Sequence, residues 1–303
     1  MAWYTALDKM IGDYLPDLEW VCDEPMAKHT SFRIGGPARR MALPKTREQL
    51  VVLAGLLQEA GIEPLLLGNG TNLLVADEGL DTVVINTSAQ LSRVEQTGEC
   101  ELTADAGVSL CQLALFAWKQ GLAGLAFAHG IPGTLGGGVV MNAGAYGGEL
   151  KDVIADVTAL YPDGVRTLTA DEMGFSYRHS VFSSGEGIVL GAKLKLEPGD
   201  PNAIKAKMDE LMARRKESQP LEFPSAGSTF KRPPGHYAGP LIESCGLKGA
   251  RIGGAEVSCK HAGFVVNAGG ATCADVLALM EKVQKTVFDT YGVLLEPEVK
   301  IVR

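Results

Sequence analysis

The sequence predicts a globular protein of mixed α and β structure with room for more than one domain. Its 303 residues are enough for two separate cores. Hydrophobic residues make up 46% and charged residues 21% of the chain, as in ordinary soluble proteins. Apolar residues recur with a helical period in some segments and form short runs between turn residues in others, which indicates both kinds of element.

Four segments are predicted to be helices. Residues 45–61 and 108–121 each begin with a Thr or Ser and a Gln in capping-box spacing, and each ends at a glycine. Residues 202–218 are highly charged and predict a surface helix. Residues 272–291 predict a helix that is followed by Gly292, and its inward face consists of Val276, Leu279, Met280, Val283 and Val287.

Strands are predicted where short apolar runs lie between turn residues. Residues 64–68, 72–76 and 81–87 are such runs. Residues 154–169 predict two strands joined by a Pro-Asp-Gly turn. A further strand is predicted within residues 187–198, and the chain then breaks at "PGDP", which is the best candidate for a domain boundary.

Charge and cysteine usage exclude several classes of protein. The net charge of −8 opposes non-specific binding of nucleic acid, and no basic run offsets it. The N-terminal segment is acidic and interrupted by polar residues, so we expect neither a signal peptide nor a membrane span. The six cysteines never form C-x-x-C, which is typical of reduced thiols and does not support a metal site. We therefore expect a cytoplasmic protein, and we infer no obligate protein partner.

The segment 129–149, "HGIPGTLGGGVVMNAGAYGGE", has glycine at nearly every second or third position and almost no charge. Glycine weakens helices and strands, because it loses more conformational freedom on folding than other residues. The surrounding residues are apolar rather than those of a flexible linker, so we expect the segment to be ordered. Close approach of a ligand to the main chain is one reason for ordered glycine.

A second glycine-containing turn, "GNGTN" at residues 68–72, lies between two predicted strands. Consecutive backbone N–H groups in such a turn can bind a phosphate, with Thr and Asn as further donors. It is not a Rossmann fingerprint, because Leu73 replaces the third glycine, and it is not a Walker loop. A plain tight turn is the structural alternative. A pyrophosphate held between the two glycine-containing segments is the interpretation that we favour.

Seven motifs occur in this chain in a fixed order: "LLLGNGTNLLVAD", "GIPGTLGGGVVMNAGAYGGE", "YRHSVF", "PSAGSTFKRPPGHYAGPLIE", "GLKGARIGGAEVS", "KHAGFVVN" and "LEPEV". Together they resemble the family of UDP-N-acetylenolpyruvoylglucosamine reductases, flavoenzymes of peptidoglycan precursor synthesis and thus of the bacterial cell wall. The resemblance extends from about His29 to Val299. The compact length and "GSTFKRP" are similar to the shorter, type II branch of the family.

The resemblance implies an α+β fold of the p-cresol methylhydroxylase and vanillyl-alcohol oxidase type. In that fold two α+β subdomains bind FAD, and a C-terminal α/β domain binds the substrate. The first subdomain would comprise residues 1–85 with a last strand at about 299–303. The second would comprise residues 86–198, and the substrate domain residues 199–298.

The resemblance also implies bound FAD, with NADPH as the co-substrate. "GNGTNLL" contains no His or Cys that could bond covalently to the flavin, so we expect non-covalent FAD, with His129 as the nearest alternative attachment point. The expected FAD contacts are Gly68, Asn69, Gly70, Thr71, Asn72, Leu73, Gly130, Ile131, Pro132, Gly133, Thr134, Asn142, Ala143, Gly144, Ala145 and Tyr146.

The implied reaction is the reduction of UDP-N-acetylglucosamine enolpyruvate to UDP-N-acetylmuramate. Hydride reaches C3 of the enolpyruvyl group, and the negative charge that builds at C2 requires a cation near the carboxylate and an acid beside C2. By motif, Arg178 would hold the carboxylate, Ser228 would give the proton, and Glu298 would orient the same group. Taken alone, these residues have structural alternatives: a surface arginine, a capping serine and a solvated carboxylate.

Arg232 and Lys248 are the expected contacts of the UDP diphosphate. Two positions depart from the usual pattern of the branch: Ser218 replaces a lysine before "QPLE", and Cys259 replaces a glutamate after "GAEVS". Two other functions remain open, namely another FAD-linked oxidoreductase of the same fold and a flavin- or nucleotide-binding module without activity. Anaerobic titration with NADPH and then with the substrate separates the three.

Overall fold

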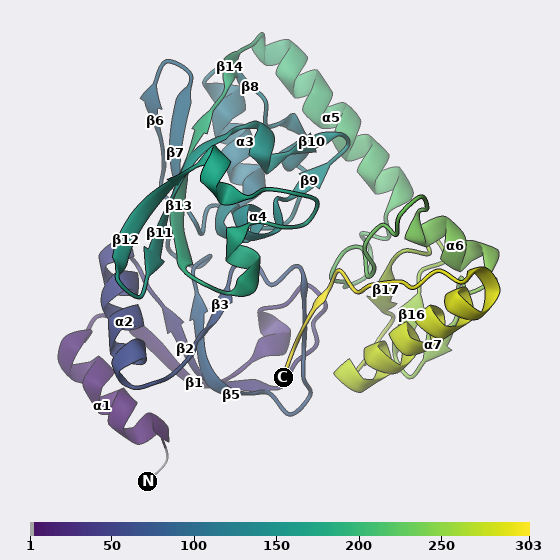
Figure 1. Ribbon diagram of the computed structural model, residues 1–303, viewed down its shortest axis with the longest axis horizontal. Helices are drawn as coiled ribbons and strands as arrows, with labels where there is room; N and C mark the ends of the chain where they lie inside the picture. The colour runs from purple at the N-terminus through teal and green to yellow at the C-terminus, as the bar shows by residue number, and fades with distance from the viewer. Residues whose placement is uncertain (1–2) are drawn as a thin grey trace. The chain divides into compact units, whose positions relative to one another are not determined.

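The computed structural model describes residues 3–303, and the chain divides into two compact units (Figure 1). Unit 1 comprises Met1–Cys22, Arg40–Asn69 and Thr82–Arg214. Unit 2 comprises Asp23–Arg39, Gly70–Asp81 and Arg215–Arg303. The chain therefore passes several times between the units before residue 215. The three-domain division at residues 85 and 198 remains a prediction.

The main sheet of unit 1 has five strands in the order β12-β11-β13-β7-β6. All of its neighbouring strands are antiparallel. The hairpin predicted at residues 154–169 is confirmed as β11 and β12. The Pro-Asp-Gly turn between the two strands lets the chain reverse direction within three residues. The strands are β6 (Val94–Gly98), β7 (Glu101–Asp105), β11 (Ile154–Tyr161), β12 (Gly164–Thr169) and β13 (Ile188–Lys195).

The helices of unit 1 confirm the predictions made from capping residues. The hydroxyl of Thr46 accepts a hydrogen bond from the backbone of Gln49 at 3.2 Å, and Ser109 and Gln112 form both halves of a capping box. The charged helix α5 has only three buried apolar side chains, which join the core of unit 1. The α-helices that begin in this unit are α1 (Trp3–Tyr14), α2 (Arg47–Glu59), α3 (Leu110–Lys119), α4 (Leu135–Met141) and α5 (Pro201–Ser218).

A second sheet has four strands in the order β1-β2-β5-β3. The boundaries between unit 1 and unit 2 fall within three of these strands, β1, β2 and β5. The apolar run at 81–87 is confirmed as β5, and β3 pairs with it in parallel. The sheet consists of β1 (Glu19–Pro25), β2 (Pro37–Leu43), β3 (Leu65–Leu67) and β5 (Leu80–Asn86). Short pairs are formed by β8 (Leu122–Ala123) with β14 (Glu197–Pro198), and by β9 (Gly144–Ala145) with β10 (Gly148–Glu149). The 3₁₀ helices are η1 (Met26–Lys28), η2 (Ala126–Ala128), η3 (Leu150–Asp152), η4 (Ala170–Met173) and η5 (Val181–Ser184).

Unit 2 is built around α7 (Cys273–Tyr291), whose predicted inward face is buried as expected. Gly292 ends this helix in the left-handed conformation, which glycine adopts without a steric cost. The last strand, β18 (Lys300–Val302), pairs in parallel with β4 (Leu73–Val75), so the end of the chain completes a sheet begun near residue 73. The other elements are α6 (Ala238–Ser244), β15 (Arg251–Ile252), β16 (Ala255–Val257) and β17 (Val265–Asn267).

The glycines of segment 129–149 pack mainly against the protein itself. Three of them lie in α4, beside the five-stranded sheet (Figure 1). A Cβ at Gly136 would lie 2.9 Å from the Cβ of Ala106, and one at Gly138 would lie 2.7 Å from Leu150 Cδ1. Added Cβ atoms at Gly144 and Gly148 would also meet protein atoms at under 3.0 Å. At these four positions the close neighbour is protein, so packing within the fold is enough to require glycine there.

Two neighbouring glycines of α4 should respond in opposite ways to alanine. Gly136→Ala should lower the free energy of unfolding by about 1–3 kcal/mol, because the new methyl group overpacks against Ala106. Gly137→Ala should raise it by about 0.5–1 kcal/mol, because Gly137 is exposed and its Cβ would meet only Thr134 Oγ1 at 3.5 Å. Chemical denaturation of the two variants tests this, and equal changes would contradict it.

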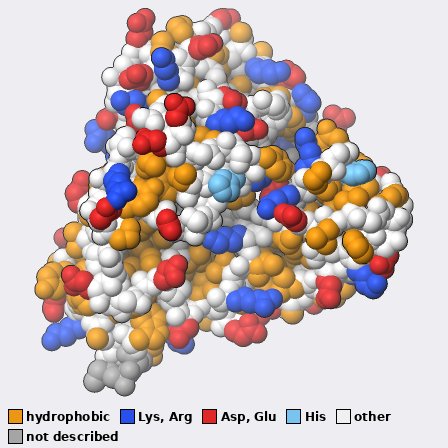
Figure 2. All heavy atoms as spheres, viewed as in Figure 1, with side chains coloured by type: hydrophobic (Ala, Val, Ile, Leu, Met, Phe, Trp, Pro, Cys, Tyr) orange, Lys and Arg blue, Asp and Glu red, His pale blue; other side chains and the backbone are white. Residues whose placement is uncertain are grey.

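The surface carries mixed charge. Basic and acidic side chains are interspersed over the face seen in Figure 2. Within residues 3–303, no helix has both the length and the apolar character needed to cross a bilayer.

Candidate functional site

The two glycine-containing segments meet in unit 1. Asn69 Nδ2 donates a hydrogen bond to the carbonyl of Pro132 at 2.7 Å. A Cβ at Gly68 would lie 2.4 Å from Thr134 Oγ1, so the approach of the first turn to the second segment requires glycine at this position. Thr134 is itself buried and caps α4 by accepting from the backbone of Gly137. The two segments thus adjoin in the fold, and a pyrophosphate between them remains a prediction.

His129, directly before the second segment, has a buried ring nitrogen. Its Nδ1 atom has no hydrogen-bond partner among residues 3–303. Burial lowers the pKa of His129, and the nearby Lys205 lowers it further, so the imidazole is neutral at pH 7. A buried polar atom without a partner is a position where a polar group of a ligand or a water fits. The unpartnered Nδ1 of His129 is therefore consistent with a polar ligand such as FAD binding beside residues 130–134.

The remainder of the first turn belongs to unit 2. Gly70 has φ +59°, and a Cβ there would lie 2.0 Å from the carbonyl oxygen of His29. Asn72 is tied to the C-terminal region, since its Nδ2 donates to the carbonyl of Glu298 at 3.1 Å. This amide, predicted as an FAD contact, thus also holds the backbone of a predicted catalytic residue.

Arg178 lies in unit 1 at the third position of a tight turn. The backbones of Ser176 and His179 close the turn with hydrogen bonds of 3.1 and 3.2 Å. Arg178 has φ +54°, a left-handed conformation that is uncommon for residues other than glycine and that occurs often at functional sites. Its Nη2 donates to the carbonyl of Gly144 at 3.3 Å, so the guanidinium lies against the predicted FAD segment.

Glu149 is a residue at this site that the sequence analysis did not identify. Hydrogen bonds from Lys151 and Asn142, together with the charge of Arg178, lower the pKa of the Glu149 carboxyl. The carboxylate is therefore ionised at neutral pH, and the positive charge of Arg178 favours that form. One signal was available in the sequence, because Glu149 is the only acidic residue in a segment of 21 residues, 129–149.

Ser228 lies in a loop of unit 2 and is half-buried. The next residue, Thr229, is buried and anchors the loop, since its backbone N–H donates to Gly263 at 2.9 Å and its hydroxyl accepts from Val265 at 2.9 Å. The following helix α6 begins only after Tyr237, so Ser228 is not its N-cap. The structural alternative for this serine, a cap of the next helix, is therefore excluded.

The structure brings Glu298 next to the Ser228 loop. The backbone N–H of Glu298 donates to the carbonyl of Thr229 at 2.8 Å. Glu298 is half-buried, whereas Glu296 is exposed and its side chain pairs with Lys231 at 3.3 Å. The degree of burial thus distinguishes Glu298 from Glu296, which the alternation of side chains along a strand does not. Of the three predicted catalytic residues, Ser228 and Glu298 adjoin within unit 2, and Arg178 belongs to unit 1.

The two predicted diphosphate contacts both lie in unit 2. The guanidinium of Arg232 is exposed and lies 4.4 Å from the centre of the Tyr237 ring. Lys248 Nζ is 2.6 Å from a carboxylate oxygen of Glu243, which is itself exposed. Both cations are accessible at the surface, and a phosphate would compete with Glu243 for Lys248.

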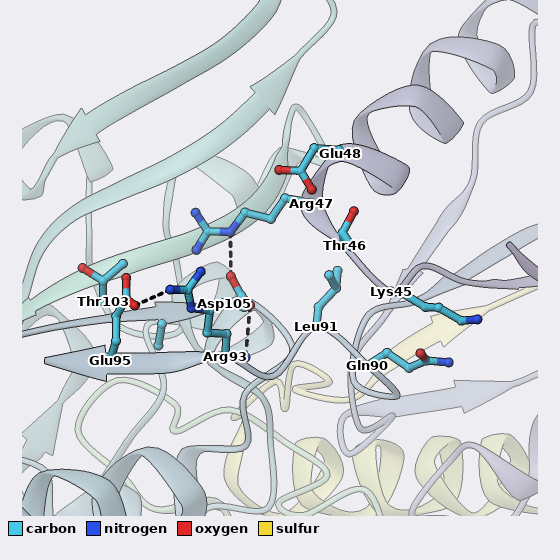
Figure 3. Close-up of a pocket in the computed structure, with 11 residues that line it drawn as sticks. Lys45, Thr46, Arg47, Glu48, Gln90, Leu91, Arg93, Glu95, Thr103 and Asp105 are labelled. Carbon is cyan, nitrogen blue, oxygen red and sulfur yellow. Dashed lines mark hydrogen bonds and ion pairs between the residues drawn. The ribbon is translucent and has the colours of Figure 1, made fainter. Parts of the chain in front are cut away.

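A cavity of about 440 Å³ lies elsewhere in unit 1 (Figure 3). None of its lining residues is a predicted site residue. Its charges largely neutralise each other, because Arg47 pairs with Asp105 and Arg93 pairs with Glu95, each at 2.6 Å. Lys45 and Glu48 complete a lining with three basic and three acidic residues, a balance that does not favour an anionic ligand over a cationic one.

Comparison with known proteins agrees with these features. Residues 38–169 match the model of an FAD binding domain, and residues 219–302 match that of the UDP-N-acetylenolpyruvoylglucosamine reductase C-terminal domain. The reductase of that name from Caldanaerobacter subterraneus is 53% identical over 92% of each chain, and that from Agathobacter rectalis is 49% identical over 97% of each. The crystal structure of the reductase from Thermus caldophilus superposes with a TM-score of 0.81 at 36% identity, covering 94% of this chain and 99% of that one.

Proposed function

This chain belongs to the UDP-N-acetylenolpyruvoylglucosamine reductase family, and from this we propose which of its residues hold the cofactor and carry the reaction. The protein is an FAD-dependent oxidoreductase of the p-cresol methylhydroxylase and vanillyl-alcohol oxidase fold type. It reduces UDP-N-acetylglucosamine enolpyruvate with NADPH in peptidoglycan synthesis. The observation that carries this function is the 53% identity to a relative along 92% of both chains.

FAD supplies the chemistry of hydride transfer, from NADPH to C3 of the enolpyruvyl group. We propose that Gly68–Leu73, Gly130–Thr134 and the backbone of Ala143–Tyr146 hold it, whereas Asn142, also predicted as a contact, has an exposed fraction of 0% and is not included. The Asn69–Pro132 hydrogen bond and the unpaired Nδ1 of His129 support this placement. The turn at 68–72 would bind the pyrophosphate through backbone N–H groups, which need no charged side chain.

Three residues of the chain then act on the substrate. Ser228 gives a proton to C2 once hydride has reached C3, and the buried Thr229 beside it keeps its loop in place. Arg178 binds the substrate carboxylate, where charge develops, with the planar donors of its guanidinium. Glu298 orients the same group from the segment just before β18, which adjoins the Ser228 loop. Arg232 and Lys248 are proposed to bind the UDP diphosphate.

Anaerobic titration tests this proposal against its rivals. NADPH should bleach the flavin, and the enolpyruvyl nucleotide should then restore its colour without oxygen. An oxidase of the same fold would be reoxidised rapidly by air but would not respond to the nucleotide. A binding module without activity would bleach slowly or not at all.

The flavin should be bound without a covalent link. "GNGTNLL" offers no His or Cys for attachment, which leaves His129 as the alternative attachment point. Acid precipitation of the purified yellow protein should therefore leave the colour in the supernatant. Colour that stays with the protein pellet would contradict this prediction.

We also propose that the enzyme works in the cytoplasm. Its six cysteines are all free thiols in the fold, which suits a reducing compartment.

A further inference from the structure

Asn142 is a fully buried polar residue at the end of α4. Its exposed fraction is 0%, and it ends the helix in the left-handed conformation with φ +40°. Glycine is the usual residue at such a position, and asparagine is the common exception. In a segment so rich in glycine, the use of asparagine here indicates that its side chain has a role.

The side-chain amide of Asn142 connects three separate backbone segments. Its Nδ2 donates to Glu149 Oε2 at 2.8 Å and to the carbonyl of Ser176 at 3.0 Å. Its Oδ1 accepts from the backbone of Lys151 at 3.0 Å. Both amide hydrogens are therefore used within the protein, and the backbone N–H bonds within α4, so no donor of this residue is left for FAD.

Two of these bonds lead to Arg178. Ser176 is the first residue of the strained turn that presents Arg178. Glu149 is ionised, and its position in β10 pairs directly with Gly144 in β9. The carbonyl of Gly144 accepts a hydrogen bond from Arg178 Nη2. A single buried amide thus holds both the backbone that carries Arg178 and the acidic group beside it.

We propose that Asn142 is a positioning residue for the substrate half-reaction, because it fixes the Arg178 turn against Glu149. This inference rests on the proposed role of Arg178 in binding the substrate carboxylate. A turn with a left-handed arginine keeps its geometry only where surrounding contacts compensate for the strain. Loss of the Asn142 amide would let the guanidinium move relative to the carboxylate that it must meet.

The test compares the two half-reactions by anaerobic stopped flow. Asn142→Gly permits the left-handed backbone but removes all three hydrogen bonds. It should keep FAD and be reduced by NADPH at nearly the parental rate. Its reoxidation at saturating substrate should slow by roughly 10- to 100-fold, the effect of a small misplacement of a catalytic group. If Asn142→Gly does not fold, Asn142→Ser gives a similar comparison, since it removes the amide donors to Glu149 and Ser176 without adding a charge beside that carboxylate.

A double-mutant cycle shows whether Asn142 acts through Arg178. In an Arg178→Ala background, Asn142→Gly should cause no further slowing of reoxidation, because the group that it positions is gone. Asp8→Asn is the stability control, since it breaks the 2.6 Å Asp8–Arg40 pair of unit 1, and both of its half-reactions should remain parental.

The outcomes separate the inference from the proposed function. A parental rate of reoxidation in Arg178→Ala would overturn the proposed role of Arg178. Slow reoxidation in Arg178→Ala combined with a parental rate in Asn142→Gly would overturn the inference alone. Two results would show that Asn142 has only a structural role. One is that the effects of Asn142→Gly and Arg178→Ala on the rate of reoxidation are fully additive, and the other is that Asn142→Gly slows both half-reactions equally.

Discussion

Replacing Ser228 by alanine should slow reoxidation of the reduced flavin by the substrate by about 10²–10⁴-fold, the usual contribution of a positioned general acid. Reduction of the flavin by NADPH should stay nearly intact, because that step places no proton on C2. The loop should not collapse, since its anchors are the backbone and hydroxyl of Thr229 rather than the side chain of Ser228.

Two further variants sharpen this test. Ser228→Cys should recover part of the rate, because a thiol can still give up a proton. Ser244→Ala is the matched control in unit 2, since it removes an exposed hydroxyl that bonds only to the carbonyl of Pro240 within its own helix. Stopped-flow traces of each half-reaction provide the measurement. Reoxidation of Ser228→Ala at the parental rate would rule out Ser228 as the donor.

Glu298→Gln should lower turnover strongly, on the order of 10²-fold, whereas Glu296→Gln should leave it close to parental. Glu298 is half-buried beside the Ser228 loop, so its charge acts in a partly desolvated place. The Glu296 side chain is 67% exposed, and such surface ion pairs contribute about 0–1 kcal/mol to stability. We therefore expect Glu296→Gln to change only the free energy of unfolding, and that slightly.

Steady-state turnover and thermal unfolding of both glutamine variants check this assignment. The two substitutions are the same chemically and lie two residues apart, so each serves as the control for the other. Comparable losses of turnover in two well-folded proteins would refute the assignment to Glu298.

Elements specified by neighbouring residues could be predicted from the sequence. The helices α2 and α3 have their capping residues within four positions of their first turn, and α7 shows a regular apolar face. The helix α4 could not be predicted, because three of its seven residues are glycine. Two of those glycines, Gly136 and Gly138, let it pack closely on Ala106 and Leu150, contacts that no pattern within the helix indicates.

The site shows the same division. Motifs selected Arg178, Ser228 and Glu298, but the partners that give each residue its environment come from other parts of the chain. Asn142 was predicted as a cofactor contact from its position in a motif. Its side chain instead bonds to Glu149 and Ser176, and no local pattern indicates that Ser176 would lie within 3.0 Å.

The parallel pairing of β18 with β4 has a consequence for synthesis of the protein on the ribosome. The core of unit 2 contains Phe32 and Leu74 together with Val299, so it cannot close until the last residues have been made. At a translation rate of about 5–20 residues per second, the segments 23–39 and 70–81, which contain Phe32 and Leu74, would remain without their final partners for roughly 10–50 s. Every residue of unit 1, by contrast, has been translated by Arg214. Nascent chains should therefore acquire protease resistance in two stages, with the N-terminal segments of unit 2 still cleavable after the first.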